Sequence, residues 1–562
     1  MNARSLSLRS ALALLCMSGS IIGFSAEENA ALDGTAIPLT VPRAECGRED
    51  TPETGLQGQV PAALRASGFK GFNCNLKLIG QSRNDGGNWQ SAEFRETRRS
   101  FRDDESSDSG RRDDRQLRKC GYYGSQSPSW SLSSRDPATY GTRVVDITNE
   151  SAPQLKGYLQ SAAMIDPWES LRVNTRRQLL VADQGMNAGG GPGSGPGVDV
   201  YDLSQNCGVP QLLASVAIGT GTDGGTLAPV SPFGHEGAFA PDGLTYYIGD
   251  TTNYMYHAVD LTDATHPKHI ATFVMGTMNH PFPDVDGQTF YRAHGLSVSD
   301  DGNRAYVTVP ALGTPAADLG NPKDTGNNGF VILDTSEVQA RLPNAKIKFV
   351  SQMVFKDGSA AQHTIPITIK DKPYLIHVDE GGSGGLSYAA WVSTCTAGYT
   401  PFPMARIVDI SNETKPKLAS KLLLEVNDPA KCSSVLPDLI GLAAFSYGTH
   451  YCSVDDRHNA TTLACGMFNS GIRVFDIRDP YRPKEIAYYN PAGVTTPSLA
   501  SNRQFIEGFK PGQPDWCSAE VHLDAQKGTV WSTCQDNGIL IMKFERGVWP
   551  FRDSKTPPGE QN

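Results

Sequence analysis

The chain has 562 residues, a formal net charge of −10 and 20% charged residues, with a pI near 5.6. This acidic balance argues against a general nucleic-acid binder and against a protein that binds anionic membranes by its charge. Glycine (57 residues) and proline (37 residues) are both frequent, which favours many short strands joined by turns over long helices.

The first 26 residues have the pattern of a secretory signal peptide. Arg4 and Arg9 supply positive charge, residues 10–24 are apolar, and the small residues Ser25 and Ala26 follow. No other stretch is apolar for long enough to predict a transmembrane segment. We therefore expect cleavage near residue 25 or 26 and a periplasmic or secreted protein.

Ten cysteines remain after this segment, and an even number of cysteines in an exported chain favours disulfides. We predict that the pairs Cys452–Cys465 and Cys517–Cys534 each link neighbouring strands of one repeat. The pair Cys395–Cys432 is predicted to close a loop. No Cys-x-x-Cys pair occurs, so neither a thioredoxin-type redox site nor a cysteine zinc site is indicated.

One segment recurs six times along the chain, as an apolar run that ends in aspartate and is followed by a polar turn. The copies are TRVVDIT (142–148), GVDVYDLS (197–204), YHAVDLT (256–262), GFVILDTS (329–336), ARIVDIS (405–411) and GIRVFDIR (471–478). In four copies a proline follows the aspartate at the seventh position, before a further strand. The aspartate side chain is predicted to cap the turn, and proline suits the entry to an outer, edge-like strand.

A second strand precedes each of these segments and a first strand precedes that one. Four strands in each repeated unit are the pattern of a β-propeller. A first unit starts with NWQSAEF (88–94), and six more begin near Trp168, His235, His294, His363, His450 and His522. The sequence therefore predicts an all-β fold, a seven-bladed β-propeller. The last unit lacks its fourth strand, and the early segment CNLKLIGQ (74–81) is predicted to supply it and to close the ring.

This interpretation divides the chain into four parts. They are a signal peptide (1–26), a leader of low structure (27–70), the propeller (71–545) and a C-terminal tail (546–562). Within the propeller, the mixed-charge run 95–119 is predicted to be a solvated loop of the first blade, because acidic residues balance its arginines.

In its VVDI and proline strand pairs, and in SGIRVFDIRDPYRPKEIAYYNP (470–491), the chain resembles the LVIVD-repeat proteins. These are exported bacterial and archaeal propellers of largely unassigned function. The resemblance covers about residues 71–545, and it implies the fold but little of the chemistry. A weaker resemblance is to the selenium-binding protein and methanethiol oxidase family. Those proteins are seven-bladed propellers with copper attributed to histidines near the channel, but their cysteine-centred chemistry has no matching residue here.

Five of the eleven histidines share one position, at the start of the first strand of their repeats: His235, His294, His363, His450 and His522. First strands line the channel of a propeller, so these side chains are predicted to ring its mouth on one face. Glu169 takes this position in another blade and Gln90 in the first. Loops that join second and third strands are predicted to bring further carboxylates to the same rim: Asp183, Asp250, Asp379, Glu380 and Asp536.

Imidazole nitrogens suit zinc, copper, iron or nickel, and carboxylates widen this choice. Ligands lie about 2 Å from a bound ion, so only three or four members of the ring could act together. We expect an adjacent group, such as His235, His294 and His363, or else His363, His450 and His522. The alternative is a structural hydrogen bond that was copied with each blade.

No Gly-x-Ser-x-Gly elbow and no His-Glu-x-x-His helix motif occurs in the chain. One hypothesis is a binding module of the bacterial envelope, which holds a small molecule or an envelope protein at its histidine-lined face. The alternative is a metal-dependent oxidoreductase or hydrolase, with copper, iron or zinc at the histidines. A surface-layer component is a third hypothesis, and it predicts self-assembly.

Overall fold

The structure is a computed structural model. The residues it describes are 40–83, 86–87, 89–96, 117–124, 141–183, 197–216, 234–251, 255–275, 293–310, 328–355, 357–383, 386–440, 445–496, 498, 510–545 and 547–548. These residues belong to one compact unit, Leu39–Asn562. The predicted signal peptide, most of the mixed-charge run and nearly all of the predicted tail lie outside the described residues.

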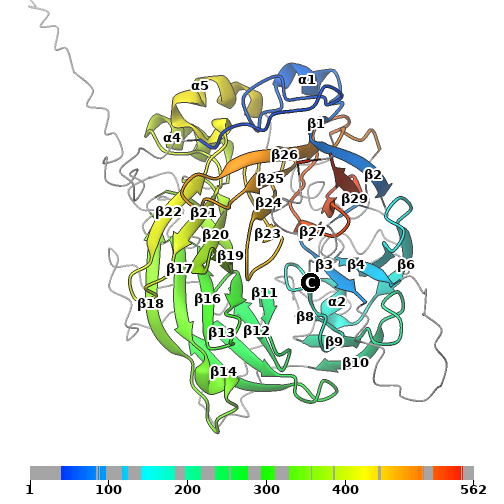
Figure 1. Ribbon diagram of the computed structural model, residues 1–562, viewed down its shortest axis with the longest axis vertical. Coiled ribbons are helices and arrows are strands. Elements are labelled where there is room, and N and C mark those ends of the chain that lie inside the picture. Colours follow the sequence, from blue (N-terminus) through cyan, green and yellow to red (C-terminus); the bar gives the residue numbers. More distant parts are fainter. Residues whose placement is uncertain are drawn as a thin grey trace, which may run out of the picture. The chain divides into compact units, whose positions relative to one another are not determined.

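The described strands form seven antiparallel sheets in a ring, the seven-bladed β-propeller predicted from the repeats (Figure 1). Within each blade, neighbouring strands in the chain are neighbours in the sheet. The first four blades consist of β3 (Ser91–Arg95), β4 (Lys119–Tyr123), β5 (Thr142–Asp146) and β6 (Gln154–Leu159); β7 (Arg172–Asn174), β8 (Leu179–Asp183), β9 (Val198–Asp202) and β10 (Gln211–Val216); β11 (Gly234–Phe239), β12 (Thr245–Asp250), β13 (Met255–Asp260) and β14 (Lys268–Val274); and β15 (Leu296–Val298), β16 (Arg304–Val309), β17 (Asn328–Asp334) and β18 (Lys348–Phe355).

The last three blades follow the same plan, and two of them also take a strand from the N-terminal side of the chain. They consist of β19 (Ser359–Ile369), β20 (Lys372–Gly381), β21 (Ala405–Asp409) and β22 (Lys417–Leu422); β23 (Cys452–Val454), β24 (Thr462–Gly466), β25 (Ile472–Asp476), β26 (Lys484–Asn490) and β1 (Phe72–Cys74); and β27 (His522–Asp524), β28 (Thr529–Cys534), β29 (Gly538–Phe544) and β2 (Leu76–Ser82). Short helices lie between strands: α2 (Ala162–Ile165), α3 (Ser336–Gln339), α4 (Tyr388–Thr396), α5 (Cys432–Val435) and the 3-10 turns η6 (Glu425–Asn427), η7 (Pro429–Lys431) and η8 (Leu436–Leu439).

Strand β2 completes the seventh blade, which confirms the predicted closure of the ring. It pairs antiparallel with β29, with Leu76 opposite Phe544 and Ser82 opposite Ile539. The short strand β1 pairs with β26 and adds a fifth strand to the sixth blade, which the repeats did not predict. Strands β1 and β2 thus form the outer edges of these two blades, and β2 joins the two ends of the propeller.

The third strand of each repeat is buried because its apolar run lies between neighbouring blades. In β5, β9, β13, β17 and β21 every residue except the final aspartate is buried. That aspartate accepts a hydrogen bond from the backbone amide two residues later, as Asp146 does from Thr148 (3.0 Å) and Asp409 from Ser411 (2.8 Å). The predicted turn cap is thus confirmed.

Hydrophobic clusters join each pair of neighbouring blades around the ring. The cluster between blades seven and one packs Tyr123 and Val145 against Trp531 and Ile541. Because one such core lies at every blade interface, the ring holds the inner strands at fixed positions around the channel.

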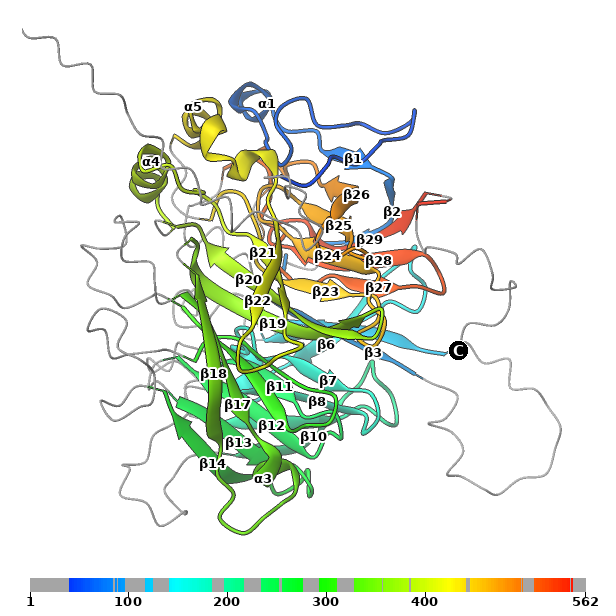
Figure 2. The same cartoon turned by 60° about the vertical axis from the view of Figure 1, so that its left-hand side comes forward.

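Residues 40–70 belong to the predicted leader, and most of them lie in loops and turns. They contain helix α1 (Ala62–Ala66), and Figures 1 and 2 show α1 near α5 and β1 beside β26. Val41 donates a hydrogen bond to Leu423 O (2.9 Å), and Gln57 donates one to Glu485 (2.9 Å). Composition could not show this order, because it depends on contacts with residues more than 360 positions away.

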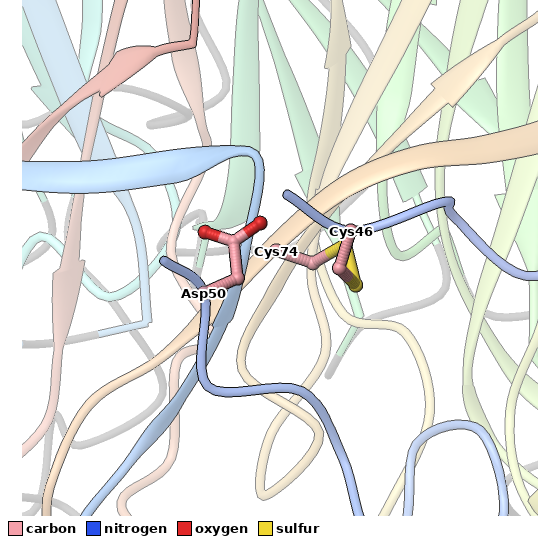
Figure 3. A group of neighbouring side chains, drawn as sticks. All are labelled: Cys46, Asp50 and Cys74. Atoms are coloured by element: carbon pink, nitrogen blue, oxygen red, sulfur yellow. A yellow bond between two sulfur atoms is a disulfide. The ribbon is translucent and has the colours of Figure 1, made fainter. Parts of the chain in front are cut away.

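Five disulfides tie the chain together: Cys46–Cys74, Cys120–Cys207, Cys395–Cys432, Cys452–Cys465 and Cys517–Cys534. The last three confirm the predicted pairs. Figure 3 shows the first, with Asp50 beside it. These three residues lie close enough for a metal site, but the two sulfurs are bonded to each other and offer no thiolate. Five disulfides indicate an extracytoplasmic, oxidising compartment. Among the described helices, none has the length and apolar character needed to cross a bilayer.

Candidate metal centre

Five side chains from five consecutive blades meet in the channel. Two are carboxylates and three are imidazoles. Four come from an inner strand or the residues just before it, and Glu380 comes from the second strand of its blade: Glu169 before β7, His235 in β11, His294 before β15, Glu380 in β20 and His450 before β23. All five residues are buried, with exposed fractions of 8% or less. We call these five residues the central cluster.

Each carboxylate of the central cluster lies between two imidazoles. The oxygens of Glu169 are 3.0 Å from His235 Nε2 and 3.2 Å from His450 Nε2. Those of Glu380 are 3.5 Å from His294 Nε2 and 3.4 Å from His450 Nε2. The ring centroids of His235 and His294 are 3.9 Å apart, so the five side chains form a closed circuit of contacts. Potential ligand atoms of Glu169, His235 and His294 all lie within 4.8 Å of one another.

Backbone carbonyls orient two of the imidazoles. His294 Nδ1 lies 3.2 Å from Gln362 O, and His450 Nδ1 lies 2.8 Å from Ser518 O. A neutral histidine that donates its Nδ1–H to a carbonyl presents the Nε2 lone pair, and this is the usual support of a metal-bound histidine. Although both carboxylates are close to it, His450 Nε2 makes no hydrogen bond within the described part of the chain. Glu169 and Glu380 keep this nitrogen protonated, and a bound metal ion would replace that proton.

The carboxylates and imidazoles of the central cluster shift one another's pKa values toward the charged forms. Burial raises the pKa of Glu380, but His294 and His450 outweigh burial and lower that pKa to about 2. Burial lowers the pKa of His450, while Glu169 and Glu380 raise it to about 10. Burial likewise disfavours an ionised Glu169, yet His235 and His450 hold its pKa well below its usual range. Every ion pair that the described residues form with Glu169 or Glu380 is with a histidine.

Gln362 in β19 and Gly295 support the central cluster, and sequence reasoning singled out neither. Gln362 Nε2 donates a 2.8 Å hydrogen bond to Glu169, and its backbone oxygen is the one that faces His294. A Cβ at position 295 would lie 1.7 Å from that oxygen, so only glycine permits the approach. The His-Gly pair at 294–295 is the sequence signal for this contact.

Five aromatic side chains pack together beside the central cluster: Trp89, Trp168, Phe445, Phe468 and Trp516. We call them the aromatic cap. The rings of Trp89 and Phe468 lie 5.4 and 5.2 Å from that of His450, and the ring of Trp168 lies 5.9 Å from that of His235. Trp168, Phe445 and Phe468 have φ values of 46°, 47° and 39°. Such backbone strain persists only where the surroundings enforce it, so the cap is a rigid wall.

The cap also has a sequence signal that was missed. In the two blades without a histidine, a tryptophan directly precedes the ring position, as Trp89 precedes Gln90 and Trp168 precedes Glu169. Aromatic side chains here exclude water from one side of the central cluster, which strengthens the electrostatic interactions inside it.

The other two ring histidines make structural contacts instead. His363 Nε2 lies 3.1 Å from Cys452 O, and its ring stacks on Tyr451. His522 Nε2 lies 3.0 Å from Ser91 Oγ, and its ring stacks on Trp531. Both histidines therefore bind the neighbouring blade, and both adjacent triplets expected from the sequence include at least one of them.

Of the expected rim residues, only Glu380 joins the central cluster. Asp183 accepts a hydrogen bond from Tyr246 (3.1 Å), Asp250 faces His257 (3.4 Å), and Asp379 forms an ion pair with Arg406. Each of these partners lies in a strand of the propeller rather than in the central cluster. Asp536 is buried with its amide bonded to Asp515, and Gln90 is buried without a hydrogen bond to any described residue.

Comparison with known protein families supports the repeat. The family model for the LVIVD repeat matches residues 406–423, which contain most of β21 and all of β22. A search of curated proteins returns no match. The comparisons do not show the weaker resemblance to the selenium-binding propellers.

Solved structures that match the chain include a functionally unknown protein from Desulfotomaculum acetoxidans (12% identity, TM-score 0.37, covering 66% of this chain and 81% of that one). Others are a protein from Lactobacillus plantarum (10%, 0.44, 73% and 87%) and the hydrazine synthase of Kuenenia stuttgartiensis (11%, 0.42, 71% and 88%). At these identities and TM-scores we transfer no function from them.

Proposed function

We propose that the protein is an exported bacterial binding propeller whose central cluster holds one divalent transition-metal ion, with copper, iron and zinc as the candidates. The observation that carries this proposal is the closed circuit of three Nε2 atoms and two carboxylates in the channel. Imidazole and carboxylate together suit these metals. A pair of buried carboxylates would also balance the charge of a divalent ion.

Burial of the central cluster favours binding over turnover. Its five residues are at most 8% exposed, and the aromatic cap covers one side. A metal-dependent oxidoreductase or hydrolase would need room for a substrate at the ion. The five disulfides agree with export through the signal peptide that the first 26 residues resemble.

The test uses the full chain, exported and purified without added metal or chelator, and measures bound metal by elemental analysis. We expect close to one equivalent of a transition metal in the wild type. His294→Ala and His450→Ala should lose it, because each removes one of the converging Nε2 atoms. His522→Ala and His363→Ala are matched controls from the same ring position, and they should keep the metal.

Two results would contradict the proposal. One is a folded wild-type protein that takes up no metal when titrated with Cu²⁺, Fe²⁺ or Zn²⁺. The other is equal metal loss in the His522→Ala control, which would mean that folding rather than coordination was disturbed. Circular dichroism of each variant separates these cases.

A further inference from the structure

A cavity of about 370 Å³ lies among the inner strands of five blades. Residues in or beside β7, β11, β15, β19 and β23 form most of its wall. The residues of the central cluster are not among those that line it, so the cavity is a separate site. Its volume falls in the range of small-molecule sites.

The charged side chains of the cavity wall are balanced. They are two arginines and two glutamates: Arg172, Arg457, Glu236 and Glu520. Arg172 lies 2.5 Å from Glu236 and 3.9 Å from Glu520. A ligand with a charge of its own would leave one charge in the cavity without a partner, at a cost in binding free energy. The balance therefore favours an uncharged ligand.

The pair of Arg172 and Glu520 suits a hydroxyl group. The 3.9 Å between Arg172 Nη1 and Glu520 Oε2 is too long for a hydrogen bond, so both atoms can bind a third group placed between them. A hydroxyl is both a donor and an acceptor, whereas an ammonium group only donates and a carboxylate only accepts. A hydroxyl can therefore donate to Glu520 and accept from Arg172 at once, and both bonds are charge-assisted.

Two serine hydroxyls of the wall offer acceptors. Ser297 Oγ lies 2.6 Å from Thr364 Oγ1, and Thr364 donates to Tyr306 O (2.8 Å). Because that bond uses the single hydroxyl proton of Thr364, Ser297 is the donor to Thr364, and its own lone pairs remain to accept. Ser453 likewise donates to Val521 O. Both serines are partly exposed, so a ligand hydroxyl can donate to them.

Apolar side chains lie between these polar groups. Val173, Phe239, Ile365 and Val454 line the cavity and are partly exposed. A sugar ring carries hydroxyls around its rim and C–H groups on its faces. Its faces can therefore pack on these apolar side chains while its hydroxyls reach the polar groups.

We propose that this cavity binds an uncharged polyhydroxylated molecule of the size of a small sugar. One hydroxyl of the ligand bridges Arg172 and Glu520, and others donate to the serines of the wall. A purely apolar ligand would leave these polar groups without hydrogen bonds. The site does not depend on the metal proposed for the central cluster.

The test is calorimetric titration of the full chain with four uncharged sugars: glucose, galactose, mannose and maltose. We expect at least one of them to bind with a Kd of about 1 mM or lower, which a few net hydrogen bonds provide. The 6-amino-6-deoxy and uronic acid analogues of that sugar are charged at pH 7. They should bind at least about tenfold more weakly. Cyclohexanol, which has a similar ring but one hydroxyl, should not bind.

Two variants locate the binding site. Glu520→Leu removes the acceptor that faces Arg172 and should weaken sugar binding at least about tenfold, as the loss of a hydrogen bond to a charged group does. Glu49→Leu is the matched control, because Glu49 is an exposed carboxylate outside the cavity, and its affinity should equal that of the wild type. Val454→Trp fills the cavity from β23 and should abolish binding. Circular dichroism checks that each variant is folded.

Lack of binding by all four sugars would overturn the proposal, as would equal affinities for a sugar and its charged analogues. Binding that survives both Glu520→Leu and Val454→Trp would also overturn it. A sugar could instead coordinate a metal ion, so the titration is repeated with excess EDTA. Unchanged binding supports the cavity, whereas loss of binding assigns the sugar to the metal and overturns the proposal.

Discussion

Glu169 of the second blade lies 3.2 Å from His450 of the sixth blade, although these blades are not neighbours in the ring. The channel is therefore narrow enough at this level for side chains from different sides to meet. The sequence predicts an adjacent group of histidines, and the central cluster draws its five side chains, two of them carboxylates, from consecutive blades. A carboxylate bridges the distance, because Glu169 contacts both His235 and His450.

This bridge makes Glu169 the most direct test of the central cluster. Glu169→Gln keeps the length and shape of the side chain but removes its charge. We expect the affinity for the bound metal to fall at least about tenfold, because even partners that only support a ligand contribute this much. Competition with a chelating dye measures the change.

Glu425→Gln is the control for this variant, since Glu425 pairs with Arg43 in the leader segment and lies outside the channel. Its metal affinity should equal that of the wild type. If Glu169→Gln bound metal as tightly as this control, Glu169 would not belong to the ligand set.

The fold could be predicted because its signals are local and repeated. The buried run that ends in Asp146 or Asp409 specifies a strand and a turn within about seven residues, and six copies specify the ring. The membership of the central cluster could not be predicted in this way. His294 and His363 share one position in the repeat, yet one bonds Gln362 through Nδ1 and the other bonds Cys452 through Nε2. The direction of each side chain decides whether its histidine joins the central cluster. That direction depends on the neighbouring residues, which differ from blade to blade.

The contacts of the leader could not be predicted for the same reason, because they depend on residues far away in the chain. Cys46 and Cys74 form a disulfide, and the segment between them packs on the sixth blade. No periodic pattern marks this segment, because its order comes from long-range contacts such as that of Arg473 with Glu53. A pattern-based interpretation therefore finds the blades but not the contacts that hold the leader on them.

The burial of the His363 imidazole predicts that the stability of the protein depends on pH. Burial lowers its pKa to about 3, so the folded protein keeps this imidazole neutral where the unfolded chain, with a pKa near its ordinary value, takes up a proton. Its contribution to stability is thus complete above about pH 6.5 and is lost as the pH falls toward 3. Between pH 7 and pH 5 this one residue should lower the free energy of unfolding by about 2 kcal/mol.

Urea unfolding at several pH values measures this slope, and His363→Gln is the comparison because it cannot titrate. We expect the variant to be less stable at pH 7, since the contact with Cys452 changes, but to lose less stability on acidification than the wild type. Parallel pH profiles for the two proteins would show that His363 is protonated equally in the folded and unfolded states.

The close packing of Gly80 predicts that ring closure requires a glycine at this position. It lies in β2 at a β-bulge opposite β29, and a Cβ at this position would be 1.9 Å from the backbone oxygen of Glu150 in the first blade. Gly80→Val should therefore destabilise the protein by about 1–3 kcal/mol, the usual cost of overpacking. Gly157→Val is the matched control in the outer strand β6, where nothing lies within 4 Å of the added Cβ. Similar midpoints of unfolding for both variants would argue against close packing of β2 on the first blade.

The disulfide Cys120–Cys207 predicts how strongly the first two blades depend on a covalent link. It joins β4 of blade one to the segment after β9 of blade two, across 87 residues, whereas Cys452–Cys465 spans 13 residues within one blade. A crosslink that closes a longer loop restricts the unfolded chain more, so replacing both cysteines by serine should cost about 4.6 kcal/mol for the long loop and about 3 kcal/mol for the short one. Chemical unfolding of the two double variants under oxidising conditions measures this order. If the short-loop variant were the less stable, packing around Cys452 rather than loop entropy would dominate, because that cysteine's backbone also contacts His363.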